Sequence, residues 1–171
     1  MVSALSMAAN ILAMKLRAKE AVQDNELSVV KKAFENVRGL AVGMSASDQY
    51  ILNNSSAELV IVEALQKSQD KDKVKGANDA IKIIEQAATR TDLYGADTIY
   101  RLVKTGADIA RGLIKEKPED AKRLFDKAIG SYISAAPGVV AMLAVEFAGA
   151  MDEKDGRALL MRTAKDRKSV V

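Results

Sequence analysis

The sequence predicts an all-α protein: a single-domain bundle of about six to eight helices, spanning residues 1–171, around a central apolar helix at 135–151. Two observations lead to this prediction. Apolar residues between Asp97 and Lys115 recur at the spacing of an α-helix, and the segment 135–151 carries only one charge, Glu146. That segment is shorter than the roughly 20 apolar residues of a membrane span, so we expect it to be a buried core helix.

The first helix is predicted over residues 2–23, because its larger apolar side chains recur at helical spacing and share one face. Such a stripe suits core packing or a partner helix. A membrane surface is the less favoured alternative, since the Lys and Arg residues of this segment gather at one end. A second helix is predicted from about Leu27, ending near Gly39 and Gly43, which form a GxxxG spacing typical of close helix contacts.

A polar turn is predicted at residues 53–56, followed by a third main helix over Ala57–Gln69. Ser55 and Glu58 match a capping box at its start. The run 59–62 is continuously aliphatic and is also compatible with a buried strand. We favour a helix because the flanking residues are helix-compatible and no second strand is evident.

The segment Thr91–Glu116 shows the most regular helical pattern in the chain, and a shorter helix is predicted before it at residues 77–89. Its apolar positions and its charged positions step by three and four on opposite faces. Ion pairs are expected on the charged face, between Lys104 and Asp108 and between Asp108 and Arg111.

Pro118 and the two acidic residues after it predict the start of a further helix. The apolar helix at 135–151 follows, and Glu146 within it has two interpretations. It is either a buried carboxylate with a raised pKa or, as we favour, a side chain that reaches solvent or pairs with Lys or Arg. A last helix and a basic C-terminal tail at 162–171 complete the chain.

The chain contains no Cys and no His, which excludes a thiolate nucleophile, a Ser-His pair and the common zinc ligands. No glycine-rich phosphate loop or other catalytic motif is present in the sequence. We therefore predict a protein that is not an enzyme, with no catalytic, cofactor-binding or metal-binding residue. Without a recognisable signal peptide, the expected location is the cytoplasm or the interior of a macromolecular assembly.

Self-association is the predicted function, because 49% of the chain is apolar while only 4% is aromatic. With few bulky rings to fill one core, some helices are expected to bury a face against another copy or another helical protein. A shell, filament, scaffold, virion part or adaptor would fit this description. The residues predicted to mediate self-association are Leu5, Ala8, Leu12, Leu16, Gly39 and Gly43.

Nucleic-acid binding is the alternative function. The net charge of +3 is too small to require a polyanionic partner, but the basic residues near the C-terminus are suited to neutralising phosphates. The residues predicted to make these contacts are Arg162, Lys165, Arg167 and Lys168.

Overall fold

The computed structural model describes residues 1–40, 43–130, 132 and 136–168, which form eight α-helices and no strand. The prediction of an all-α fold with six to eight helices is therefore confirmed for this part of the chain. In chain order the helices are α1 (Val2–Arg17), α2 (Asp24–Gly39), α3 (Ala46–Lys67), α4 (Lys73–Ala88), α5 (Ala96–Arg111), α6 (Pro118–Gly130), α7 (Pro137–Ala148) and α8 (Glu153–Lys168).

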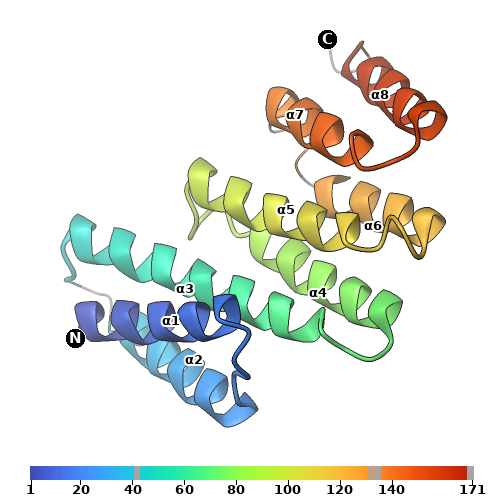
Figure 1. Cartoon of the computed structure of the whole chain (residues 1–171). Coiled ribbons are helices and arrows are strands. Elements are labelled where there is room, and N and C mark those ends of the chain that lie inside the picture. The colour runs from blue at the N-terminus through green and yellow to red at the C-terminus, as the bar shows by residue number, and fades with distance from the viewer. Residues whose placement is uncertain (41–42, 131, 133–135, 169–171) are drawn as a thin grey trace.

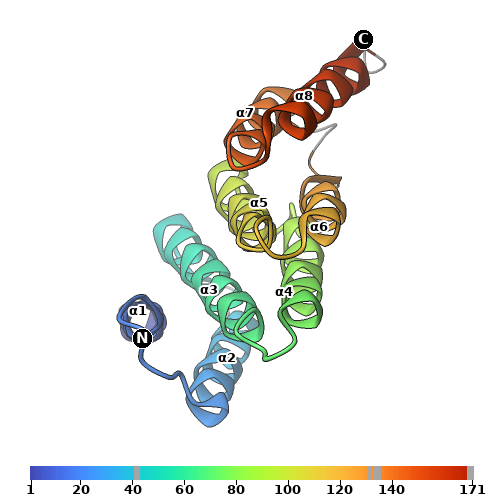
Figure 2. The same ribbon diagram turned by 45° about the vertical axis from the view of Figure 1, so that its right-hand side comes forward.

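The helices are stacked largely in chain order, with α1 and α2 at one end and α7 and α8 at the other (Figures 1 and 2). Buried apolar side chains form two clusters, one among α1, α2 and α3 and a larger one that extends from α3 to α8. Only α3 contributes to both clusters among the described helices, and it packs against α1, α2, α4 and α5. It is therefore the helix that joins the two parts of the stack.

The prediction that residues 135–151 form the centre of the bundle is wrong. The helix in this segment, α7, packs mainly on α8 and also contacts α5, close to the C-terminal end of the stack (Figure 1). One side of α7 is buried, through Val140, Leu143 and Phe147. Met142 and Val145 are exposed on it, so the apolar composition of this segment does not reflect burial on all sides.

Helix α3 is continuous through residues 53–56, where the sequence predicts a turn. Ser45 caps the helix instead, and its Oγ accepts a hydrogen bond from the backbone N–H of Asp48 at 3.1 Å. Two polar side chains of the expected turn bond to other segments: Thr98 Oγ1 donates to Asn54 Oδ1 at 2.5 Å, and Ser56 accepts from Arg38. These hydrogen bonds explain why polar residues occur inside this helix. The aliphatic run after it is helical, as predicted.

Glu58 is a buried carboxylate in the middle of α3, with 7% of the residue exposed. It accepts hydrogen bonds from Arg17 of α1, at 3.3 Å, and from Arg101 of α5. Because a buried carboxylate is costly without partners, these two arginines are needed to satisfy it. The three residues tie α1, α3 and α5 together.

Helix α5 is shorter than the predicted Thr91–Glu116, but both predicted ion pairs are present. Asp108 lies 3.7 Å from Lys104 and 2.9 Å from Arg111. Lys104 also donates a hydrogen bond to Glu146 of α7 at 2.8 Å. This contact lowers the pKa of Glu146 and raises that of Lys104. The interpretation of Glu146 as a paired carboxylate is confirmed.

The pair between Lys104 and Glu146 predicts a pH-dependent contribution to stability. The lowered pKa of Glu146 stabilises the folded chain above pH 4.5, the ordinary pKa of a glutamate. This contribution disappears as the pH falls through the pKa of the folded state. The raised pKa of Lys104 stabilises the folded chain below pH 10.5, the ordinary pKa of lysine. This contribution disappears as the pH rises through the pKa of the folded state.

We therefore expect Glu146→Gln to be less stable than the parent by about 0.2–1 kcal/mol near neutral pH, the range for partly exposed pairs. Urea unfolding across the pH range should show this difference shrinking in acid below 4.5 and in base above 10.5. The exposed Glu35→Gln is the control. A difference that is constant with pH would contradict an ionic contribution.

Candidate self-association surface

The apolar stripe that the sequence assigns to self-association is largely used within the chain. Leu12 and Leu16 are 4% and 9% exposed, in the apolar cluster that α1 forms with α2 and α3. Leu5 and Ala8 are half-buried. The prediction that this whole stripe faces another copy is therefore wrong, because Leu12 and Leu16 already have their partners inside the fold.

The GxxxG interpretation of Gly39 and Gly43 is also wrong. Gly39 is the last residue of α2, whereas Gly43 lies in a turn with φ of 102°. A Cβ added to either residue would meet no atom within 4 Å. The spacing therefore does not mark a face where two helix backbones approach, and the conformation of Gly43 explains why a glycine is present there.

The opposite side of α1 carries a row of exposed apolar side chains. Met7, Ile11 and Met14 are 64%, 50% and 64% exposed, and their spacing of four and three places them on one face. Val29 of α2 adds a fourth exposed apolar side chain, at 68%. No residue from 1 to 14 has a charged side chain, so most of α1 is uncharged both toward the core and toward solvent.

A shallow groove of about 380 Å³ lies between α1 and α2, where Ile11 and Val29 both line it. Of its lining residues, only Glu26 is charged. Lys15 donates a hydrogen bond to the Glu26 carboxylate at 2.5 Å, and this bond is the main cause of the lowered pKa of Glu26. The remaining lining residues are Ala8, Leu12, Asn25 and Val30. Together with Met7 and Met14, the groove forms what we call the α1–α2 apolar face.

The sequence contained the signal for this face. Met7, Ile11 and Met14 have the same helical spacing as the buried stripe, displaced around the helix. When apolar residues occupy two sides of one helix, periodicity does not tell which side meets the core. The Leu stripe of α1 is the buried side, and the row of Met7, Ile11 and Met14 is the exposed side.

The four basic candidates for nucleic-acid binding all fall in α8, which continues to Lys168, so the predicted tail is helical as far as that residue. Arg162 is paired with Asp126 of α6. The side chain of Lys165 is exposed. The side chains of Arg167 and Lys168, and all of residues 169–171, lie outside the described residues.

Comparisons with protein-family models, with curated proteins and with solved structures give no significant match to this chain. Over the described ranges, no helix has both the length and the apolar character that crossing a membrane requires. The same residues contain no cluster of three or more acidic side chains arranged to hold a metal ion.

Proposed function

We propose that this protein is a non-enzymatic structural component that binds a second copy of itself through the α1–α2 apolar face. The observation that supports the proposal is the row Met7, Ile11 and Met14 beside Val29, since each of these side chains is at least half exposed. Exposed apolar side chains gathered on one face are typical of protein contact sites, whereas isolated ones are ordinary.

The distribution of charge favours a second copy as the occupant. A symmetric dimer places the same surface on both sides of the interface. The first charged residue of α1 is Lys15, and it is already paired with Glu26. Two such faces can therefore meet over the Met7 to Met14 row without bringing like charges together or burying an unpaired one.

The size of the face is also adequate. Helices α1 and α2 have 16 residues each, and a helix of that length is about 24 Å long. Two adjacent helices are about 20 Å wide together, so the flat footprint is roughly 480 Å² per partner, close to the lower bound of about 1,000 Å² in total for a specific interface. Methionine is suited to such a surface because its flexible side chain adapts to the partner.

A second group of exposed apolar side chains occurs at the far end of the stack, where Met142, Val145 and Met161 are 46%, 59% and 70% exposed. Contact between this end and the α1–α2 apolar face would join copies head to tail and produce a filament. Contact of the α1–α2 apolar face with itself produces a closed dimer. We propose the closed dimer, because the α1–α2 face has the defined groove and the long uncharged row.

The test is the solution mass from light scattering behind a sizing column, over a range of concentrations and at low and high salt. We expect about twice the chain mass of 18.4 kDa, with little change at high salt because the contact is apolar. Ile11→Glu should raise the dimer dissociation constant at least tenfold, since it places a charge at the centre of the face.

Met142→Glu provides the matched control, because it introduces the same charge on another exposed helical position at the far end of the stack. It should leave the dimer intact. Loss of association in Met142→Glu and not in Ile11→Glu would place the interface at α7 and α8 instead. A monomer at all concentrations would contradict self-association, and mass gained only with added DNA at low salt would support the nucleic-acid alternative.

A further inference from the structure

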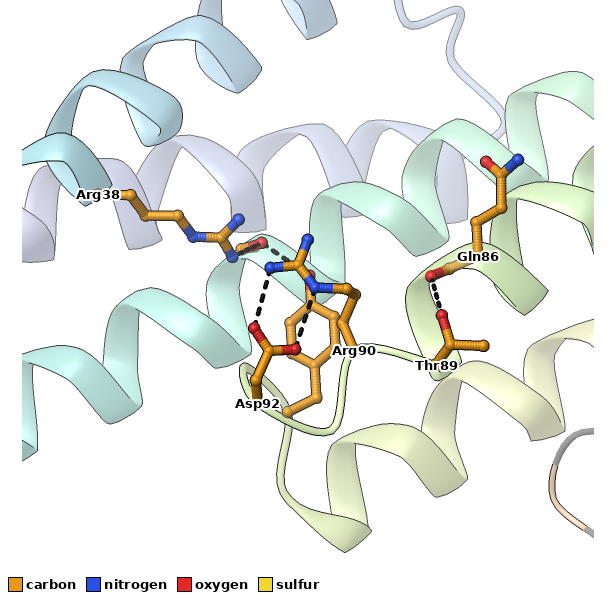
Figure 3. Close-up of polar contacts among 7 residues, drawn as sticks. Arg38, Gln86, Thr89, Arg90 and Asp92 are labelled. Atoms are coloured by element: carbon orange, nitrogen blue, oxygen red, sulfur yellow. Dashed lines mark hydrogen bonds and ion pairs between the residues drawn. The ribbon is translucent and has the colours of Figure 1, made fainter.

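A cluster of polar side chains joins the end of α2, the middle of α3 and the connection between α4 and α5. Figure 3 shows the side chain of Arg38, from α2, extending toward those of Arg90 and Asp92, from that connection. Ser56 accepts a hydrogen bond from Arg38 and shares another with Tyr94, and both residues are 6% exposed. This cluster is remote in sequence from the exposed row of α1, and nothing in the proposed self-association uses it.

The hydrogen-bond donors of Arg38 are incompletely used. Its Nη2 donates to Ser56 Oγ at 2.5 Å, and the same oxygen shares a hydrogen bond of 3.0 Å with Tyr94 Oη. The Arg38 Nε, in contrast, is buried and has no hydrogen-bond partner among the described residues. Buried donors are almost always satisfied, and leaving one unpaired costs about 1–3 kcal/mol, so this N–H calls for an acceptor.

Asp92 does not supply that acceptor. Arg90 donates to both of its carboxylate oxygens, from Nε and from Nη2, each at 3.0 Å. The pKa of Asp92 is lowered chiefly by this contact with Arg90, and the nearby charge of Arg38 adds to the effect. Arg38, Arg90 and Asp92 therefore place two guanidinium groups beside one carboxylate, an excess of one positive charge.

We propose that Arg38 and Arg90 together bind one oxyanion, a phosphate group either free or as a monoester. The planar guanidinium group matches phosphate oxygens in a bidentate arrangement, and two of them neutralise most of the charge of the anion. Ser56, which is itself hydrogen-bonded to Tyr94, holds the Arg38 guanidinium in place from the buried side. Asp92 competes with the anion for Arg90, and because its side chain is 63% exposed it can turn into solvent when the anion binds.

The role of Asp92 gives the proposal a distinctive signature. Removing an arginine should weaken binding, whereas removing the competing carboxylate should strengthen it. We expect Arg90→Gln and Arg38→Gln to raise the phosphate dissociation constant about tenfold or more, and Asp92→Asn to lower it severalfold. Arg90→Gln leaves the contact between Arg38 and Ser56 intact, so it tests the site even when Arg38→Gln lowers stability.

The measurement is isothermal titration of the full chain with inorganic phosphate and, separately, with phenyl phosphate, at constant ionic strength set by sodium chloride. Binding of inorganic phosphate alone would identify the free ion as the ligand, and tighter binding of phenyl phosphate would identify a monoester. Arg157→Gln and Glu153→Gln, from an exposed ion pair in α8, are the matched controls and should leave binding unchanged.

The proposal is overturned when neither probe binds above the chloride background. It is also overturned when Arg38→Gln and Arg90→Gln bind phosphate as the parent does, or when Asp92→Asn binds more weakly than the parent. Each of these outcomes leaves the dimer of the preceding subsection untouched, because neither Arg38 nor Arg90 lines the groove between α1 and α2.

Discussion

Replacing Phe125 by alanine is expected to destabilise the protein by about 3–5 kcal/mol, the usual cost of deleting a fully buried aromatic ring. Phe125 of α6 is 0% exposed, and Phe147 of α7, on which it stacks, is 1% exposed. The ring centroids are 4.1 Å apart, with an angle of 27° between the planes. The substitution removes this aromatic contact and leaves a cavity at the place where α7 joins the rest of the stack.

Urea unfolding followed by circular dichroism measures this effect, and Tyr50→Ala is the control. Tyr50 is also an aromatic residue of a helix, but it is 71% exposed, so its substitution should change stability by less than about 0.5 kcal/mol. A decrease of less than about 1 kcal/mol in the free energy of unfolding of Phe125→Ala would contradict the burial of this pair. An early partial loss of helical signal, followed by a main transition at the parent's urea midpoint, would instead show that the C-terminal helices unfold separately.

The parts of the fold that could be predicted from the sequence are those governed by local signals. In α5 the apolar and charged positions alternate regularly around the helix, and the pairs that Lys104 and Arg111 form with Asp108 follow from spacing alone. In α6, the proline and acidic residues of the first turn mark the start of the helix. These features depend on residues within a few positions of one another.

The predictions that are wrong concern structure that is decided by residues far away in the sequence. The polar run 53–56 predicts a turn because polar residues favour turns, but Thr98 and Tyr94 satisfy Asn54 and Ser56 inside the fold. The apolar composition of 135–151 predicts a central helix. Its exposed Met142 and Val145 show that apolar composition predicts a need for contact without saying whether the contact lies within the chain.

The two candidate sites also differ in whether the sequence reveals them. The row on α1 is visible in the sequence as a periodic pattern, although its orientation is not. The cluster of Arg38 and Arg90 leaves no such pattern, because the two residues belong to different elements and meet only when α2 and the α4–α5 connection pack on α3. A site built from single residues on separate helices is invisible to any argument from spacing.

Gly76→Ala is the second substitution with a large expected effect, and its sign is unusual. Glycine inside a helix is ordinarily less stable than alanine by about 0.5–1 kcal/mol, so this exchange usually stabilises a helix. Gly76 lies in α4 and is buried. A Cβ at this position would lie 2.6 Å from the backbone oxygen of Lys67 and 2.8 Å from Cβ of Asp70, both near the end of α3.

Neither distance is tolerated without movement of the backbone, so we expect Gly76→Ala to destabilise the protein by about 1–3 kcal/mol, as overpacked sites do. Gly39→Ala is the matched control: it also replaces a helical glycine, but a Cβ there meets nothing within 4 Å, so the change should be neutral or slightly stabilising. The urea midpoint should therefore fall for Gly76→Ala and stay unchanged or rise slightly for Gly39→Ala. A stabilised Gly76→Ala would mean that α4 does not approach the end of α3 as closely as the structure shows.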